Sequence, residues 1–194
     1  MGSPLRALVL AALSATALSF VTASVLAAPS KPVLVPDAKG DVSGKLDLQR
    51  LKLGIGTGDR LRAAVTFAGK VTPADMFVKS GPPGSVCLRV WTATNADPKS
   101  TRPDRLVCVT ARTKNALRAS VLRQEGLGLP ERVGPASVTV SKSERSFIIS
   151  IAQSALGDPA RIRYALESTR PGCDRTSCID TVPAAPATRR FRLR

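Results

Sequence analysis

Two stretches of β-type sequence, each carrying one cysteine, flank a loop in the middle of the chain at residues 85–112. In the first stretch the apolar residues Val86, Leu88 and Val90 fall on every second position, and Val107 and Val109 do the same in the second stretch. Side chains along a strand point alternately to its two faces, so this spacing predicts two strands that share one buried face. An antiparallel hairpin at the centre of the fold is therefore the strongest expectation.

The four cysteines predict how this hairpin and a later loop are joined. Two disulfides among four cysteines allow three connectivities, and we expect Cys87–Cys108 across the hairpin and Cys173–Cys178 within the loop CDRTSC. By loop-closure entropy the first would contribute about 3 kcal/mol and the second about 2 kcal/mol. A zinc site is the alternative, but a Cys-x4-Cys pair with a distant second pair is a loose arrangement for zinc. In the expected register Arg89 faces Leu106, and Trp91 faces Asp104.

The first 27 residues have the features of a secretory leader. Met1–Arg6 is a short positive segment, residues 7–26 are uncharged, and Val25-Leu26-Ala27 fits a small-residue cleavage site. An uncleaved membrane anchor is the alternative, because about 20 uncharged residues span a bilayer, but the serines and threonines in the run favour cleavage. We expect residues 28–36 to be an extended N-terminal segment and residues 37–194 to form one secreted or envelope-associated domain, without a transmembrane segment after cleavage.

Alternation of apolar and polar residues recurs along the rest of the chain. Residues 51–55 and 61–67 predict a hairpin around the turn at 56–59, and residues 137–140 and 147–151 predict another. Further alternating runs lie at 116–123, 161–166 and 189–193. Eight or nine short strands without a long amphipathic helix predict an all-β fold, a jelly-roll-like antiparallel β-sandwich.

The chain is strongly basic, with 29 Lys and Arg against 14 Asp and Glu. Without Arg6 in the leader the net charge is +14, which suits anionic partners such as wall polymers and acidic polysaccharides. Many arginines fall on the outward phase of the expected strands. The alternative to anion binding is that they only keep the outer face of the sheet solvated and prevent edge-to-edge pairing. The dense group at the end of the chain is a candidate anion-binding segment, although flexible charge also costs least at a chain end. The candidate binding residues are Arg189, Arg190 and Arg192, together with Trp91.

Trp91 is the single tryptophan, and it lies on the hairpin face opposite Val86 and Val90. There it would either form an exposed platform for a sugar or, as is commoner for a lone tryptophan near a disulfide, pack against the Cys87–Cys108 bridge.

Catalytic signatures are absent from the sequence. The chain has no histidine, which removes the Ser-His-Asp and Cys-His arrangements and nearly all catalytic zinc sites. Neither G-x-S-x-G nor S-x-x-K occurs, and the acidic residues fall mostly in turns. We predict that the protein is not an enzyme; a hydrolase working with carboxylates alone would need two acids about 5–10 Å apart in a cleft.

Three aspartates before the first hairpin, Asp37, Asp41 and Asp47, form a candidate calcium site together with the distant Asp180. Calcium takes about six to eight oxygen ligands, many of them carboxylates. Two considerations oppose this interpretation: the ligand set is small for a chain of charge +14, and Asp-x-x-Gly-Asp is also an ordinary turn. Convergence of the four carboxylates in space would favour calcium; no other cofactor is expected.

Four short motifs together resemble secreted bacterial β-sandwich proteins of unknown function and, more remotely, the family 9 carbohydrate-binding and DOMON-like modules. The motifs are Asp37-Ala-Lys-Gly-Asp41, Leu46-Asp47-Leu48, Ser-Ala-Leu-Gly at 154–157 followed by Arg161-Ile-Arg-Tyr164, and Cys173-x4-Cys178-x-Asp180-x-x-Pro183. The resemblance implies a jelly-roll-like sandwich, often with a structural calcium and sometimes with a sugar or haem site. This chain departs from the pattern because it lacks an aromatic pair for sugar and a histidine for haem.

These observations favour a secreted, non-enzymatic binding module for an anionic glycan or cell-wall polymer, with no specific nucleic-acid partner. A structural or interaction domain of the cell envelope, in which the charge serves only solubility, is the first alternative; the carboxylate-dependent hydrolase is the second.

Overall fold

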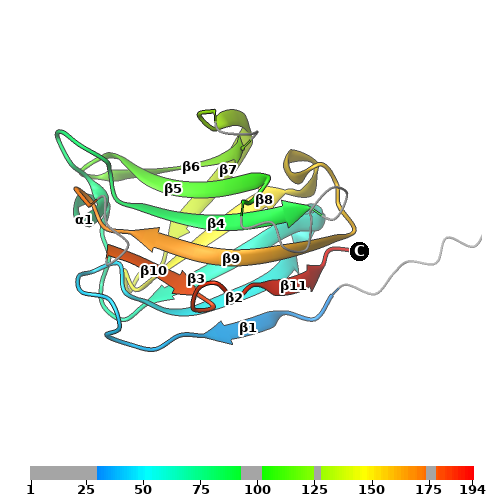
Figure 1. Cartoon of the computed structure of the whole chain (residues 1–194), viewed down its shortest axis with the longest axis horizontal. Coiled ribbons are helices and arrows are strands. Elements are labelled where there is room, and N and C mark those ends of the chain that lie inside the picture. The colour runs from blue at the N-terminus through cyan, green and yellow to red at the C-terminus, as the bar shows by residue number, and fades with distance from the viewer. Residues whose placement is uncertain (1–29, 93–101, 125–127, 174–177) are drawn as a thin grey trace, which may run out of the picture.

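A computed structural model gives the fold of the chain and describes residues 30–92, 102–124, 128–173 and 178–194 (Figure 1). The expected leader at 1–27 lies outside the described residues. The fold is all-β and the strand pairings are antiparallel, as predicted. In chain order the elements are β1 (Val33–Pro36), β2 (Leu48–Gly56), the 3-10 turn η1 (Thr57–Asp59), β3 (Arg60–Phe67), the single-turn helix α1 (Pro73–Met76), β4 (Ser85–Thr92), β5 (Arg105–Thr113), β6 (Ala116–Arg123), β7 (Glu131–Val140), β8 (Ser146–Ala152), the 3-10 turn η2 (Gln153–Leu156), β9 (Arg161–Thr169), β10 (Ile179–Val182) and β11 (Arg189–Arg192).

The strands form one continuous sheet in the order β1-β2-β3-β8-β7-β6-β5-β4-β9-β10. Both β10 and β11 pair with β9, β10 along residues 166–169 and β11 along residues 161–164. The sheet curls until β10 contacts β2, so it is a nearly closed barrel, with β4, β5 and β9 in front of β2 and β3 in Figure 1. In the described residues no ladder of backbone hydrogen bonds joins β2 to β10, so the barrel keeps a seam between these strands.

The expected sandwich of eight or nine strands needs correction, because the described residues contain eleven strands in a single sheet. The two strands that sequence patterning missed are β1 and β10, each four residues long. Four residues are too short for a clear alternation. In β10 the two inward positions are Asp180 and Val182. Because one of them is a carboxylate, the alternation of apolar and polar residues cannot be recognised in the sequence. β1 lies within the segment expected to be merely extended, and it pairs with β2.

The barrel interior is filled by the apolar phase of the strands. Phe67 of β3 and Phe147 of β8 meet edge to face, with ring centroids 4.9 Å apart and planes inclined at 68°. Each fully buried large apolar side chain stabilises the fold by roughly 1.5–3 kcal/mol. Tyr164 of β9 is also fully buried, and its hydroxyl has no hydrogen-bond partner. Other fully buried core residues are Leu48, Leu51, Leu53, Leu61, Leu88, Ile149, Ile151 and Leu156.

The central hairpin is confirmed in detail. β4 and β5 pair with Cys87 opposite Cys108 and Arg89 opposite Leu106, and the two cysteines form a disulfide. The ladder ends one pair before the expected partnership of Trp91 with Asp104, because the Asp104 carboxylate turns back to accept a hydrogen bond from the Thr92 amide at 3.1 Å. The second predicted disulfide, Cys173–Cys178, is also formed.

Candidate metal centre and candidate anion-binding surface

Side chains, rather than a strand ladder, bridge the seam between β2 and β10. Asp180 of β10 accepts a hydrogen bond from the amide of Leu48, the first residue of β2, at 2.6 Å. The Ser168 hydroxyl of β9 donates to the carbonyl of Leu46, also at 2.6 Å. Both bonds are buried, and together they fasten the end of the loop at residues 37–47 across the gap.

Three of the four predicted carboxylates converge at this seam. Asp37, Asp41 and Asp180 each offer one oxygen, and these three oxygens lie within 4.8 Å of one another. Calcium binds oxygen at about 2.3–2.6 Å, so two ligands of one ion lie no more than about 4.6–5.2 Å apart. The spacing of the three oxygens therefore fits a common ion. Asp180 is buried, Asp37 is half-buried and Asp41 is exposed, so the cluster is open on one side.

The fourth carboxylate, Asp47, lies against the same loop. It is only 6% exposed, and its Oδ2 accepts a hydrogen bond from the Gly40 amide at 2.9 Å. Among the described residues, its Oδ1 is buried without a hydrogen-bond partner, and so is Oδ2 of Asp37. The Asp37 carboxyl is also hydrogen-bonded to the Ala38 amide and to the Asp180 side chain. Buried polar atoms are nearly always paired, and leaving them unpaired is costly. Two orphaned carboxylate oxygens beside the cluster are the observation that fits a cation best.

Electrostatics at the seam oppose ionisation of Asp180 and Asp37. Burial raises the pKa of Asp180 to about 7, and the negative charges of Asp37 and Asp41 add to the effect. Burial also raises the pKa of Asp37, with further contributions from the charges of Asp41 and Asp47. A bound divalent cation would reverse this balance, because it stabilises the ionised form of every carboxylate around it.

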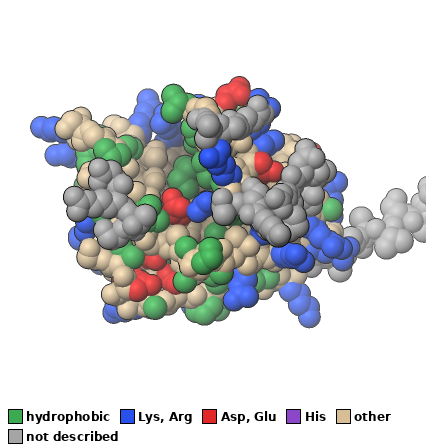
Figure 2. Space-filling model, in the orientation of Figure 1, with side chains coloured by type: hydrophobic (Ala, Val, Ile, Leu, Met, Phe, Trp, Pro, Cys, Tyr) green, Lys and Arg blue, Asp and Glu red, His purple; other side chains and the backbone are tan. Residues whose placement is uncertain are grey.

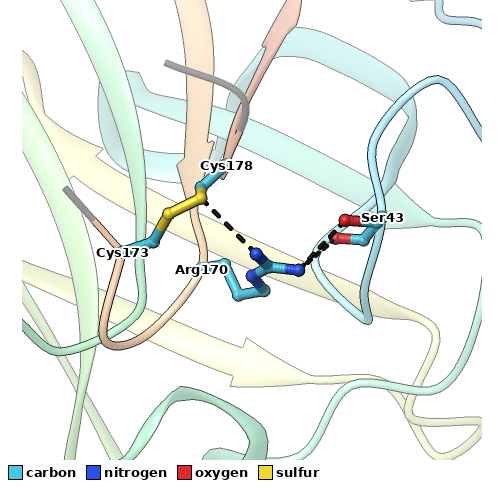
Figure 3. Close-up of a disulfide and its surroundings, with 4 residues drawn as sticks. All are labelled: Ser43, Arg170, Cys173 and Cys178. Carbon is cyan, nitrogen blue, oxygen red and sulfur yellow. Dashed lines mark hydrogen bonds between the residues drawn. A yellow bond between two sulfur atoms is a disulfide. The ribbon is translucent and has the colours of Figure 1, made fainter. Parts of the chain in front are cut away.

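Arg170, just after β9, ties the aspartate loop to the Cys173–Cys178 disulfide (Figure 3). Its guanidinium donates to the carbonyl and hydroxyl of Ser43, at 3.3 and 3.0 Å, and to Sγ of Cys178 at 3.5 Å. The side chain also packs over Gly44, which has a φ of +116° and whose added Cβ would lie 3.1 Å from Arg170 Cδ. The disulfide ends two residues before Asp180, so Arg170 links both halves of the cluster.

The predicted binding residue Trp91 is covered. It is 4% exposed, and the guanidinium carbons of Arg89 and Arg163 lie 5.4 and 4.9 Å from its ring centroid. Within the described ranges its indole Nε1 has no hydrogen-bond partner. Trp91 points away from the core, as expected, but the guanidinium groups of Arg89 and Arg163 lie over its ring, so the ring is not an open platform. Its part in binding stays a prediction.

The arginines of β11 divide between the two faces of the sheet. Arg190 lies opposite Arg163 and Arg192 lies opposite Arg161, whereas Arg189 lies opposite the buried Tyr164. Arg189 is exposed all the same, and its charge partly offsets the rise that burial produces in the pKa of Tyr164. Sequence reasoning missed Arg161 and Arg163 as members of this group. The motif Arg-Ile-Arg-Tyr gave their outward phase, but only the register of β9 with β11 gives their partners.

The hollows on the outer surface of the barrel include two that described residues line. One, of about 390 Å³, lies over β4 and β5 beside the Cys87–Cys108 disulfide and is lined by Arg89, Leu106 and Glu167 among others. The recessed surface near the middle of Figure 2 lies over the same strands. The other, of about 300 Å³, is lined by residues that include Lys52, Ile55 and Arg62. Among the described lining residues, Glu167 is the acid of the first hollow and the second has none.

Comparison of the chain with protein-family models, with curated proteins and with solved structures finds no match. The resemblance to family 9 carbohydrate-binding and DOMON-like modules therefore stays a prediction. In the described residues no helix is long and apolar enough to cross a membrane. The two disulfides are compatible with an extracellular protein.

Proposed function

We propose that the chain is a secreted, non-enzymatic binding module that holds a calcium ion at the seam of its barrel and recognises an anionic glycan or wall polymer. The observation that carries the calcium site is the convergence of three carboxylates within 4.8 Å beside the orphaned, buried oxygens of Asp47 and Asp37. The ligands would be Asp37, Asp41 and Asp180, with Asp47 close behind them and backbone oxygens or water completing the shell.

The role of the ion in this proposal is structural. The cluster joins the loop before β2 to β10, and in the part of the chain that the structure describes no ladder joins β2 to β10. A cation there draws together carboxylates that otherwise repel one another across the gap.

The non-enzymatic part of the proposal draws on the positions of the acids. Two-carboxylate hydrolysis needs its acids about 5–10 Å apart across a cleft that admits substrate. Asp180 is 3% exposed and bonded to the Leu48 amide, so it is poorly placed to reach a substrate. In the larger hollow Glu167 is engaged by the Arg89 guanidinium at 3.2 Å. A structural role therefore suits the aspartate cluster that includes Asp180, and the contact between Glu167 and Arg89 suits a structural ion pair.

Calcium titration followed by thermal unfolding tests the proposal. Extracellular calcium modules bind with a Kd of about 0.1–1 mM, so 5 mM calcium should raise the free energy of unfolding by about 1–2 kcal/mol. Magnesium should give a smaller gain, because it keeps its water shell. Asp41→Asn removes one exposed ligand and should abolish the calcium gain, whereas Asp59→Asn, an exposed turn residue away from the seam, should retain it. Equal gains in both variants, or no gain in the unmutated protein, would refute the site.

A further inference from the structure

The pair β9–β11 carries four arginines on one face. Ile162 and Tyr164 of β9 and Phe191 of β11 are buried, so the residues that alternate with them point outward. The register then places Arg190 directly opposite Arg163, and Arg192 directly opposite Arg161. We name Arg161, Arg163, Arg190 and Arg192 the arginine grid. Lys and Arg side chains gather at the right of Figure 2, over β11 and the start of β9.

The arrangement of the grid is unfavourable for stability alone. Like charges directly opposite each other on adjacent strands destabilise a sheet, and Arg192 opposite Arg161 is such a contact. In the described part of the chain, the salt bridges do not join an acidic side chain to Arg161, Arg190 or Arg192, although Nε of Arg192 donates a hydrogen bond to the carbonyl of Arg194. All three side chains are exposed. A solvated sheet face needs charge, but it does not need one arginine directly opposite another, and an anionic ligand would offset the repulsion between them.

Neighbouring groups hold the grid in place and extend it. The ring of Trp91 lies 4.9 Å from the Arg163 guanidinium carbon, and such a contact restrains the guanidinium. On the other side Ser30 donates a hydrogen bond to the carbonyl of Arg192, and the exposed Lys31 follows it. The positive surface therefore runs from β9 across β11 to the start of the described chain.

We infer that the arginine grid is the docking surface for an anionic polysaccharide, through its repeated carboxylate or sulfate groups. Guanidinium groups bind such oxyanions in a bidentate manner. Cross-strand neighbours stand about 5 Å apart and alternate residues on a strand about 6.7 Å apart, so the grid offers a flat array of sites that suits a polymer better than a single small ion. The inference rests on the proposed function for the extracellular nature of the partner.

Two other polyanions fit the surface less well. Single-stranded nucleic acid is held largely by bases stacked on exposed aromatic side chains, and Trp91 is covered. Membrane surfaces hold proteins through inserted apolar residues as well as charge, but the exposed large apolar side chains of the described residues are Leu34, Leu129 and Val133, none of them in β9 or β11.

The test uses the calcium-supplemented protein, with heparin as the polysaccharide probe. Arg190→Gln/Arg192→Gln removes half of the grid, and Arg112→Gln/Arg118→Gln removes two exposed arginines from the β5–β6 hairpin, with the same change in net charge. Near physiological salt we expect the first variant to bind heparin about tenfold more weakly and the second less than twofold. The dependence of log affinity on log salt should become shallower by about two for the grid variant. Thermal unfolding of the grid variant should be unchanged or shifted upward, since repulsion is relieved.

Three outcomes would overturn the inference. Equal losses of heparin affinity in the two variants would mean that only net charge matters. The absence of heparin binding at physiological salt would rule out a docking surface for anionic polysaccharide. Tighter, grid-dependent binding to duplex DNA or to vesicles containing phosphatidylglycerol would assign the grid to another partner. Failure of the calcium site is distinguishable, because a null calcium titration leaves the difference between the two variants untouched.

Discussion

The β4–β5 hairpin and the β2–β10 seam are both places where two strands of the barrel are held together, but the interactions that hold them differ. The hairpin has a continuous ladder, an apolar inner face and a cross-strand disulfide, Cys87–Cys108. At the seam there is no ladder, and buried bonds from Asp180 and Ser168 to backbone atoms take its place. The forces at the hairpin depend little on pH or cations, whereas those at the seam depend on whether carboxylates are charged. We therefore expect solution conditions to act mainly on one side of the molecule.

The largest expected effect comes from removing the Cys87–Cys108 disulfide of the hairpin. Cys87→Ala/Cys108→Ala should lower the free energy of unfolding by about 3 kcal/mol, because the unfolded chain gains loop entropy. The measurement is urea denaturation with and without calcium. The loss should be the same in both conditions, since β9 separates the disulfide on β4 and β5 from Asp180 on β10, and neither cysteine takes part in the carboxylate cluster. A loss that disappears when calcium is added would mean that the two regions are not independent.

A second prediction concerns the pH dependence of the calcium-free protein. The pKa of Asp180 is about 7 in the fold against 3.8 for the ordinary group, so between those pH values the folded state binds more protons than the unfolded state. The free energy of unfolding should therefore fall as pH rises from about 4 to about 7, by of the order of 2 kcal/mol. Urea denaturation at pH 4.5 and pH 8 in the presence of EDTA measures the difference.

Asp180→Asn is the matched variant for this pH effect. It keeps an oxygen for the Leu48 amide but does not titrate, so most of the fall between pH 4.5 and pH 8 should vanish. Calcium should stabilise the unmutated protein more at pH 8 than at pH 4.5, because protonated carboxyls are poor ligands. A calcium-free protein that becomes more stable with rising pH would contradict the assignment.

The smallest expected effect concerns Arg170, which we regard as a positioning residue for the cluster. Arg170→Ala should cost about 1 kcal/mol of stability, since its bonds are partly exposed, but should weaken calcium binding severalfold. Arg170→Lys should recover part of the affinity through its remaining charge. Calorimetric titration with calcium measures both, with Arg118→Ala as a surface control. Unchanged calcium affinity in Arg170→Ala would show that the hydrogen bonds of Arg170 to Ser43 and Cys178 do not organise the aspartate loop.

Patterning predicted the parts of the fold that are held by local, repetitive structure. The alternating valines gave the β4–β5 hairpin and its register, and the cysteine spacing gave both disulfides. β10 was missed because Asp180 occupies an inward position, where patterning looks for an apolar residue. The same buried acid is what completes the carboxylate cluster. For Arg161 and Arg163 the outward phase was visible, but their places opposite β11 depend on pairings across 31 and 27 residues, which periodicity does not encode.

Amide hydrogen exchange, followed residue by residue with and without calcium, tests the central claim most directly. Protection reports local opening of each hydrogen bond. Calcium should slow exchange of the Leu48 and Gly40 amides, which are bonded to Asp180 and Asp47, and leave locally exchanging amides of β4 and β5 nearly unchanged. Equal slowing in both regions, or no slowing at Leu48 and Gly40, would contradict a barrel whose seam is closed by cation-dependent carboxylates.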